Sequence, residues 1–349
     1  MLRADRRGDD SWRVTETVMK RQIRRIGAIG CTIAAIGLVI ALYLITRPFP
    51  PIREGHDVFG FASNTGTRTP TGSVPAIDRY PARDGEQLSF QFYDSTGEVI
   101  LVFVHGSSYH GAGYHTLARE LSDAGVAKVY LPNLRGHYLS GQRRGDVDYI
   151  GQLEDDLADL VAYIRDRDQR GPLVLGGHSS GGGLAIRVAG GEHGGLASAY
   201  LLLSPVIPLA PTTRGGDAGG WAHLHRSRLY GLLVLNAVGV TGLNGLPIIQ
   251  FNKPETFRDG TETLSYSYRL NTSFHPRYDY AADIEAMGDQ FLLLIGDDDQ
   301  SNDPVAYEEM FPQSGAEARV MRLPGVDHLG VFSAPSALSA MQDWFRALP

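Results

Sequence analysis

The hydrophobic pattern predicts a chain in which short apolar strands alternate with amphipathic helices. Runs of strand-like residues occupy positions 77–82, 88–93, 99–104, 128–131, 172–175, 199–203 and 290–295. Apolar residues recur at helical spacing in positions 114–124, 153–164 and 338–348. Strands that alternate with helices in this order predict an α/β fold, with a mainly parallel central sheet and helices on both faces.

Residues 209–280 interrupt this alternation between two predicted core strands. The stretch contains Trp221, the apolar run 229–240 and a series of tyrosines and phenylalanines. A structureless loop of this length is improbable in a compact domain, so the pattern predicts a helical lid insertion over the site. The aromatic residues suggest an acyl-chain pocket, although core packing of the insertion explains any single one equally well.

A long apolar segment lies near the amino terminus, before the first predicted strand: residues 26–45 carry no charge. About twenty helical residues at roughly 1.5 Å each cover the ~30 Å hydrocarbon core of a bilayer, which predicts a transmembrane helix over residues 26–46. Basic residues stand immediately before it: Lys20, Arg21, Arg24 and Arg25. The positive-inside rule therefore predicts a cytoplasmic tail over residues 1–25 and a folded domain on the extracytoplasmic side.

A cleaved secretory signal is the alternative interpretation of this segment, but such a signal has a shorter apolar region that ends in a small-residue cleavage site. Cys31 lies inside the apolar run instead of at its end, which disfavours lipidation. Residues 47–74 begin Arg-Pro-Phe-Pro-Pro, continue to a mixture of Gly, Ser, Thr and Pro around residues 63–73, and have neither helical nor strand periodicity, so they are expected to form a flexible linker. Residues 75–349 then form the folded domain.

Composition and charge exclude some functions. Of the 349 residues, 43% are hydrophobic and 20% are charged, as is ordinary for a globular protein. The net charge of −7 and the lack of a concentrated basic face in the folded domain argue against a nucleic-acid partner. A single cysteine excludes an intramolecular disulfide.

The most informative motif is Gly-Gly-His-Ser-Ser-Gly-Gly-Gly at residues 176–183, directly after the apolar run 172–175. Glycines stand two residues before and two after Ser179, as in the G-x-S-x-G turn that projects a nucleophilic serine between a strand and a helix. A glycine-rich helix start that binds phosphate, or nothing, is the alternative. A serine also needs a base and a carboxylate.

Both partners follow Ser179 in the chain. The carboxylates of residues 297–299 come after a predicted strand, and His328 lies in a loop before the last helix. This order of serine, acid and histidine is typical of the hydrolases that carry such an elbow. Among the other histidines, three are expected to be structural (His105, His137, His178) and four have no zinc-like spacing (His110, His115, His223, His225). The aspartate run lacks the Gly and Glu of a calcium loop. A serine, acid and histidine mechanism implies no metal and no cofactor, so none is expected.

From about residue 75 to its end the chain resembles the α/β-hydrolase fold, and within it the monoacylglycerol lipase and lysophospholipase-like serine hydrolases. The resemblance rests on residues 104–106 (Val-His-Gly), 133–140 (Asn-Leu-Arg-Gly-His-Tyr-Leu-Ser), 177–181, 296–299 and 325–328. The chain departs from the family pattern at Asn133, where Asp is usual, and at Tyr138, where Gly is usual.

The resemblance implies a role for each matching residue. Ser179 would be the nucleophile, His328 the general base and Asp299 the orienting carboxylate, with Asp297 as the second choice. The backbone amides of Ser107 and Ser180 would form the oxyanion hole.

The predicted function is a membrane-anchored serine hydrolase that cleaves an ester of a lipid or another amphiphile, such as a monoglyceride or lysophospholipid. The alternatives are an acyltransferase, thioesterase or small-amide hydrolase with the same triad, or a lipid-binding protein without catalysis.

Overall fold

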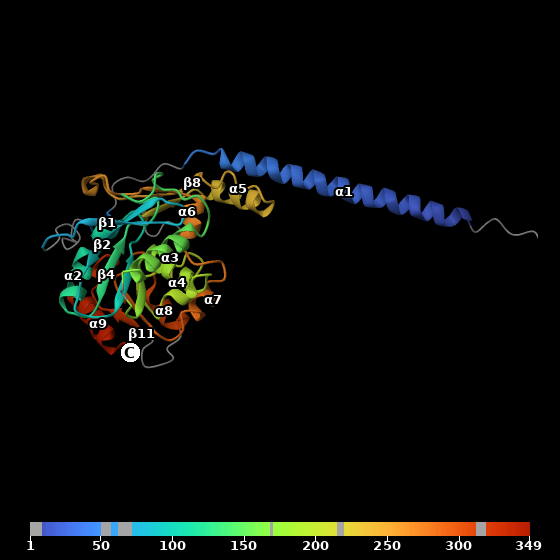
Figure 1. The fold of residues 1–349 in the computed structure, drawn as a ribbon. Coiled ribbons are helices and arrows are strands. Elements are labelled where there is room, and N and C mark those ends of the chain that lie inside the picture. The colour runs from blue at the N-terminus through green and yellow to red at the C-terminus, as the bar shows by residue number, and fades with distance from the viewer. Residues whose placement is uncertain (1–8, 50–56, 62–71, 168–169, 215–219, 312–318) are drawn as a thin grey trace, which may run out of the picture. The chain divides into compact units, whose positions relative to one another are not determined.

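The computed structural model describes residues 9–49, 57–61, 72–167, 170–214, 220–311 and 319–349 (Figure 1). Residues 1–8 of the predicted tail and residues 50–56 and 62–71 of the predicted linker lie outside the described residues. The chain divides into two units, Met1–Phe49 with His225–Leu243, and Pro50–Leu224 with Asn244–Pro349.

The larger unit is built on an eight-stranded sheet with the order β1-β2-β4-β3-β5-β6-β10-β11. Its strands are β1 (Ile77–Pro81), β2 (Gln87–Tyr93), β3 (Ile100–Val104), β4 (Lys128–Pro132), β5 (Leu173–His178), β6 (Ala199–Leu203), β10 (Phe291–Gly296) and β11 (Arg319–Leu323). The pairs β1–β2 and β2–β4 are antiparallel, and all other pairs are parallel. The predicted mainly parallel sheet is confirmed, and β11 is an additional strand that the pattern did not predict.

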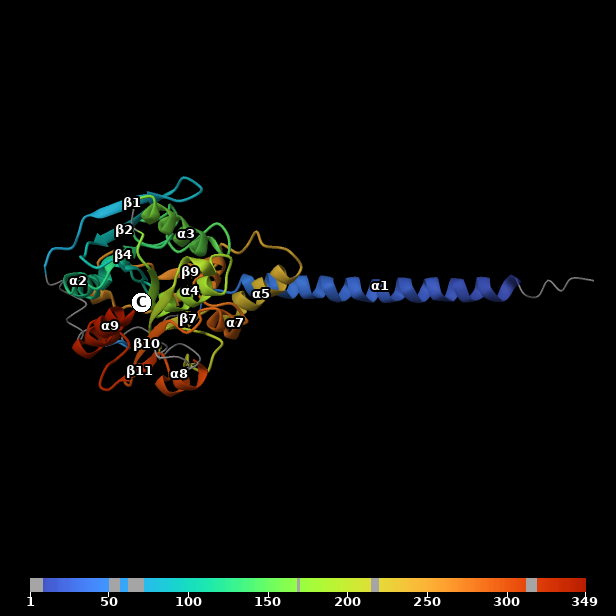
Figure 2. The same cartoon turned by 60° about the horizontal axis from the view of Figure 1, so that its bottom comes forward.

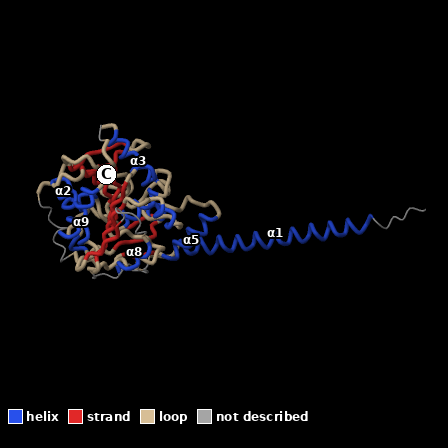
Figure 3. Tube along the Cα trace, turned by 90° about the horizontal axis from the view of Figure 1, so that it is seen from below, coloured by secondary structure: helices blue, strands red, loops and turns tan. Residues whose placement is uncertain are grey.

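Helices cover both faces of this sheet. They are α2 (His115–Asp123), α3 (Gln152–Arg165), α4 (Ser180–Ala189), α7 (Tyr280–Glu285), α8 (Pro304–Met310) and α9 (Pro335–Ala347). Seen from below, α2 and α9 lie on one side of the strands and α3 and α8 on the other (Figure 3). In the turned view α2 lies beside α9, and these two helices are in contact (Figure 2). The predicted apolar stripe of α3 is buried at Leu153, Leu157, Leu160 and Ile164.

The segment between β6 and β10 is not helical throughout, which corrects the helical insertion expected for residues 209–280. It contains a three-stranded antiparallel sheet of β7 (Ala222–Leu224), β8 (Pro247–Phe251) and β9 (Ser265–Ser267), followed by α6 (Tyr268–Ser273). In β9 Tyr266 and Ser267 are both buried, so this strand shows no alternation of buried and exposed side chains. Strands this short leave little periodic signal in the sequence, so the hydrophobic pattern did not reveal them.

The smaller unit contains two helices, α1 (Asp9–Ile45) and α5 (Arg226–Ala237). Within α1, Glu16–Ile45 is long and apolar enough to cross a membrane, by criteria that a signal sequence near the amino terminus also meets. The helix extends well before the apolar run, so the basic residues predicted to lie in the tail are helical.

Candidate active site

The sharp turn predicted at Ser179 lies between β5 and α4. The backbone of Ser179 has φ 55° and ψ −122°, a strained conformation for a residue with a side chain. A Cβ atom added to Gly177 would lie 2.3 Å from the carbonyl carbon of Gly181, and one added to Gly181 would lie 2.3 Å from the Val104 oxygen. Only glycine fits these two positions, which explains the spacing of the motif.

The structure brings Ser179, His328 and Asp299 together from three distant parts of the sequence. The Ser179 hydroxyl lies 3.1 Å from Nε2 of His328, and Nδ1 of His328 lies 2.8 Å from Oδ2 of Asp299. The imidazole is 2% exposed and Asp299 is 3% exposed. In this arrangement Nδ1–H donates to the carboxylate, which leaves Nε2 free to accept the serine proton.

Asp299 is held in its charged form. Burial by itself raises the pKa of Asp299, but the charge and hydrogen bond of His328 and the donors of the next turn outweigh burial and lower the pKa below its usual value. The backbone amides of Ser301 and Asn302 each donate to Oδ1 at 2.8 Å. Asp297 instead makes an ion pair with Arg322, so the geometry favours Asp299 over the alternative residue.

Ser107 and Ser180, the two residues expected to form an oxyanion hole, lie next to each other in space. The side-chain hydroxyls of Ser107 and Ser180 lie 2.6 Å apart. The following residue, Ser108, has a positive φ of 69°, and its amide donates to the hydroxyl of Tyr266 at 2.7 Å. Tyr266 belongs to β9, so the segment between β6 and β10 helps to fix the loop that carries Ser107. Sequence reasoning treated this tyrosine only as one of several aromatic residues.

Three buried histidines tie the loops of the site together. His178 donates from Nε2 to the carbonyl oxygen of His328 and accepts at Nδ1 from the Tyr114 hydroxyl, both at 2.8 Å. Burial, with the nearby His328 charge, lowers the pKa of His178 well below its usual value, so it stays neutral. His105 accepts from the Leu134 amide, and Nε2 of His137 lies 2.8 Å from the Tyr266 hydroxyl. These contacts agree with the structural role expected for all three histidines.

Part of the expected linker lies against the site. Phe59 is 3% exposed, and its ring stacks on the imidazole of His328 with the centroids 4.8 Å apart. It also contacts Trp221, and the neighbouring Phe61 stacks on Phe257. Residues 57–61 therefore differ from a free tether, because two large aromatic side chains leave water. The sequence predicts one linker over residues 47–74 and does not single out Phe59 and Phe61.

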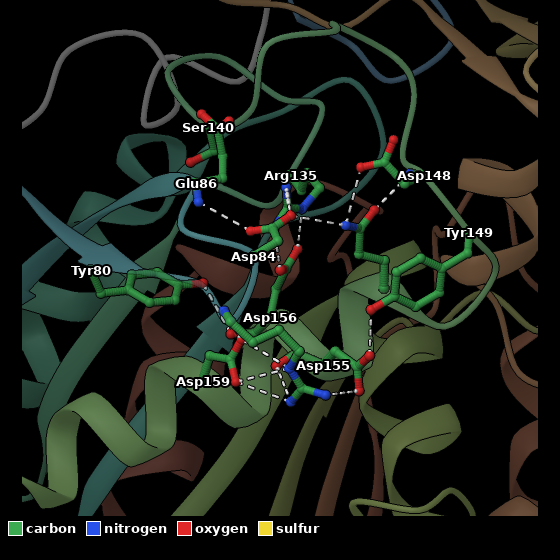
Figure 4. A network of polar contacts seen from close by, with 12 residues as sticks. Tyr80, Asp84, Glu86, Arg135, Ser140, Asp148, Tyr149, Asp155, Asp156 and Asp159 are labelled. Atoms are coloured by element: carbon green, nitrogen blue, oxygen red, sulfur yellow. Dashed lines mark hydrogen bonds and ion pairs between the residues drawn. The ribbon is translucent and has the colours of Figure 1, made fainter.

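The loop after β4 carries a separate polar network (Figure 4). Arg135 makes a bidentate pair with Asp156, with Nε and Nη2 at 2.9 and 2.8 Å from the two carboxylate oxygens. Its Nη1 also lies 2.9 Å from Asp84 in the turn between β1 and β2. The network joins the β1–β2 turn, the loop after β4 and α3, and none of its residues reaches Ser179.

The two residues that depart from the family pattern, Asn133 and Tyr138, both lie in this loop. Asn133 accepts from the Gly111 amide at 2.8 Å and donates to the Ser89 hydroxyl at 2.8 Å, so both ends of its amide are used. Tyr138 adopts a φ of 39°, a conformation in which glycine is more common.

A pocket of about 260 Å³ adjoins the loop that carries Ser107. Its lining includes Ser108, Tyr109, Phe61, Phe257 and Lys253. Apolar rings and polar groups thus share one cavity beside the predicted oxyanion loop. In the part of the chain that the structure describes, no cluster of three His, Cys, Asp or Glu side chains could hold a metal ion.

Comparison with known proteins shows the family of the chain. Residues 101–341, more than half of the chain, match the family described as Alpha/beta hydrolase family. The chain belongs to this family. Within it, the chain is 30% identical over 114 residues to a monoacylglycerol lipase of Mycolicibacterium smegmatis, covering 33% of this chain and 40% of the relative. It thus spans less than half the length of this relative.

Two solved structures extend the likeness of this alpha/beta hydrolase over most of the chain. A monoacylglycerol lipase of Paleococcus ferrophilus has a TM-score of 0.56 and 20% identity, covering 74% of this chain and 98% of its own. A membrane phospholipase A described as a bacterial virulence factor has a TM-score of 0.55 and 15% identity, covering 95% of this chain and 100% of its own. At these identities the likeness shows the fold.

Proposed function

We propose that this alpha/beta hydrolase is a membrane-anchored serine esterase that cleaves a carboxylic ester of a lipid or another amphiphile. The observation that carries the proposal is the hydrogen-bonded series from Ser179 through His328 to Asp299, at 3.1 and 2.8 Å. A serine hydroxyl is a poor nucleophile without such a base, and a series of this kind recurs in acyl-transfer enzymes of unrelated folds.

The reaction proceeds in two halves. Ser179 Oγ attacks the ester carbonyl carbon while Nε2 of His328 takes its proton, and the oxyanion accepts hydrogen bonds from the amides of Ser107 and Ser180. The carbon–oxygen bond to the leaving alcohol then breaks, and His328 returns the proton to that alcohol. Water then attacks the carbonyl carbon of the acyl-serine while His328 takes its proton; the bond from that carbon to Ser179 Oγ breaks, His328 returns the proton to Oγ, and the carboxylic acid leaves.

Two observations support an amphiphilic substrate and a membrane anchor. Glu16–Ile45 is long and apolar enough to span a bilayer, with a basic cluster inside its first turns. The relatives include a monoacylglycerol lipase, and a neighbour in fold is a membrane phospholipase A. In this proposal α1 spans the bilayer with its amino-terminal end in the cytoplasm, and the hydrolase unit meets lipids on the other side.

Active-site labelling tests the chemistry. A fluorophosphonate probe reacts only with an activated serine, so the wild-type protein should be labelled and Ser179→Ala should not. Ser301→Ala serves as the matched control, because the Ser301 contact to Asp299 is made by its backbone amide. If wild-type protein, shown to be folded, takes up no label, the proposal of a serine hydrolase is wrong and a lipid-binding role takes its place.

A substrate panel then defines the reaction. Monoglycerides, lysophospholipids and short water-soluble esters are presented to the full-length protein in detergent and in vesicles, and the products are identified with and without an added alcohol acceptor. We expect free fatty acid as the main product. A new ester formed from the acceptor at the expense of free acid would make the protein an acyltransferase.

A further inference from the structure

Beyond its first turn, helix α5 carries apolar side chains on its exposed side as well as on the side that packs on α1. No charged residue occurs from Leu229 to Leu243, yet Leu233, Val234 and Val238 are 45%, 43% and 68% exposed. A surface helix of a water-soluble protein presents one apolar stripe and one polar face, whereas a helix that is apolar all round is surrounded by protein or by lipid. The protein leaves these side chains of α5 uncovered.

The other side of α5 packs closely on α1. A Cβ atom added to Gly231 would lie 2.7 Å from Cγ2 of Ile45 and 2.8 Å from the carbonyl oxygen of Ala41. Ala41 itself is fully buried. Small residues at such a contact let two helix backbones approach, as they do between helices in membranes, where packing replaces the hydrophobic effect.

Polar groups fasten the carboxyl-terminal end of α1 to the beginning of α5. Arg228 donates from Nε to the Ile45 oxygen at 3.1 Å and from Nη2 to the Arg47 oxygen at 3.2 Å, and Nε2 of His225 lies 2.8 Å from the same Arg47 oxygen. The last carbonyls of a helix lack intrahelical donors, and a cation is favourable beside them. Such a cluster of charged and polar groups is favourable at the membrane surface and costly inside the hydrocarbon core.

Exposed tyrosines lie at the same level of the two helices. Tyr43 is 59% exposed, two residues from each of the α1 contact positions Ala41 and Ile45. Tyr230, also 59% exposed, adjoins Gly231. Tyrosines are enriched where membrane proteins pass from hydrocarbon to headgroups.

The contacts also fix the direction of α5. Arg228 meets Ile45 and Arg47, and Gly231 meets Ala41 and Ile45, so α5 runs back along α1, antiparallel to it. Its 12 residues make a helix of roughly 18 Å at ~1.5 Å per residue. That is too short to cross a ~30 Å hydrocarbon core, and it suits a segment that enters from one surface and ends inside.

We infer that residues 225–243 form a second membrane-embedded element, which docks on α1 through Gly231 and turns Leu233, Val234 and Val238 toward the acyl chains of the bilayer. The inference rests on the proposed function, in which α1 spans that bilayer. As a helix, α5 satisfies its own backbone hydrogen bonds in lipid. The hydrolase chain then has two attachments to the membrane, one of them inside the segment that separates β6 from β10.

The test places an environment-sensitive fluorophore on single cysteines of the full-length protein in phosphatidylcholine vesicles. Cys31, the only cysteine, is labelled in the native protein, and Val234→Cys, Val238→Cys and Tyr278→Cys are labelled after Cys31→Ser. Tyr278, 89% exposed in the hydrolase unit, is the aqueous control. We expect lipids with a spin label on the acyl chain to quench positions 31, 234 and 238, and iodide to quench position 278.

The outcomes separate the two proposals. If position 31 is quenched by lipid while positions 234 and 238 are quenched by iodide, the anchor holds and the inference about α5 is wrong. It is equally wrong if positions 234 and 238 are shielded from both quenchers, since protein then covers them. If position 31 is not quenched by lipid, the anchor itself fails.

A separate variant tests the contact between Gly231 and α1. Gly231→Leu places a side chain where the Ala41 oxygen lies, so it should separate the helices and shift position 234 from lipid to iodide quenching. Gly242→Leu is the matched control, because a Cβ atom there meets nothing within 4 Å. Identical quenching at position 234 in both variants would show that α5 does not depend on α1, contrary to the inference. Hydrolysis of a short water-soluble ester should be unchanged in both.

Discussion

Asp299 and Asp156 are both buried carboxylates with a basic side chain in hydrogen-bond contact, but their surroundings differ. Asp299 faces a histidine at 2.8 Å and accepts from two backbone amides. Asp156 faces Arg135, a cation that stays protonated, in a bidentate pair (Figure 4). The pKa of Asp299 is lowered below its usual value, whereas burial raises the pKa of Asp156 to about 6 even though Arg135 opposes the rise.

The difference separates a group suited to chemistry from a group suited to holding loops. A carboxylate beside a titratable imidazole can stabilise the positive charge that forms when the histidine takes a proton. A carboxylate beside a permanent cation cannot take part in such a cycle. The ion pair of Asp156 and Arg135 instead holds the loop after β4 against α3 and the β1–β2 turn. Exchanging or removing one partner in each region tests this distinction.

The largest effect is expected at Asp299. Asp299→Asn keeps the shape of the side chain but removes the charge and favours the wrong imidazole tautomer, so kcat should fall by about 10⁴-fold. Ester hydrolysis at neutral pH measures it, and circular dichroism checks the fold. Asp297→Asn, which removes only the pair with Arg322, should change kcat less than about threefold, as is usual for a partly exposed pair. The reverse pattern would move the acid to Asp297.

Breaking the other pair should affect stability more than catalysis. Arg135→Met leaves Asp156 buried without its closest cation, which should cost about 3–5 kcal/mol of unfolding free energy at pH 8. The pKa of Asp156 is already raised, to about 6, and should rise further without Arg135. A raised pKa in the folded state gives stability that is present below the unfolded pKa and is lost as the pH rises through the folded pKa.

Urea unfolding at pH 5 and pH 8 measures this dependence. The cost of Arg135→Met should be smaller at pH 5, where Asp156 can take a proton, than at pH 8. Arg346→Met is the control, since it removes an exposed pair with Asp343 and should cost less than about 0.5 kcal/mol at both pH values. A cost that does not change with pH would mean that Asp156 is not the group left without a partner.

The sequence was sufficient to predict the parallel sheet and the turn at Ser179, because each depends on a local pattern, whereas the choice of His328 and Asp299 as its partners came from the resemblance to the α/β-hydrolases. Apolar runs of five or six residues specify buried strands, and Gly177 and Gly181 specify the turn through steric contacts of their own backbones. The order of the acid and base loops along the chain then follows from the fold, since carboxyl ends of parallel strands meet at one edge.

Contacts that depend on distant partners could not be read from the sequence. Phe59 sits in a stretch rich in Gly, Ser and Thr, and only the ring of His328 beside it makes it part of the site. Tyr266 looked like one of several aromatic residues until its hydroxyl met the Ser108 amide. The short strands β7, β8 and β9 form through pairing with one another, which a periodicity within three to five residues does not reveal.

Asn133→Asp adds a third case to the comparison, a buried carboxylate with hydrogen-bond donors but no cation. Asn133 is 1% exposed, and its partners are the Gly111 amide and the Ser89 hydroxyl. The variant restores the residue usual in the family and should cost about 2 kcal/mol at pH 8, and less at pH 5, because burial raises the pKa of the introduced carboxyl. Gln342→Glu, an exposed amide-to-acid change, should be neutral in the same urea titration. A stabilised Asn133→Asp would show that donors alone are enough to hold a buried charge here.

The smallest effect is expected from removing one hydroxyl in each region. Tyr266→Phe takes away the acceptor of the Ser108 amide, and Tyr80→Phe takes away the donor to the Asp156 carbonyl oxygen, a bond of 3.1 Å. Each hydrogen bond lost should cost about 1 kcal/mol of stability, one bond for Tyr80 and two for Tyr266, whose hydroxyl also contacts Nε2 of His137. Only Tyr266→Phe should also lower kcat, by about tenfold if half of one oxyanion donor's contribution is lost, with KM nearly unchanged. Equal kcat in the two variants would show that the Ser107 loop keeps its geometry without Tyr266, and that the segment between β6 and β10 does not set the position of the oxyanion donors.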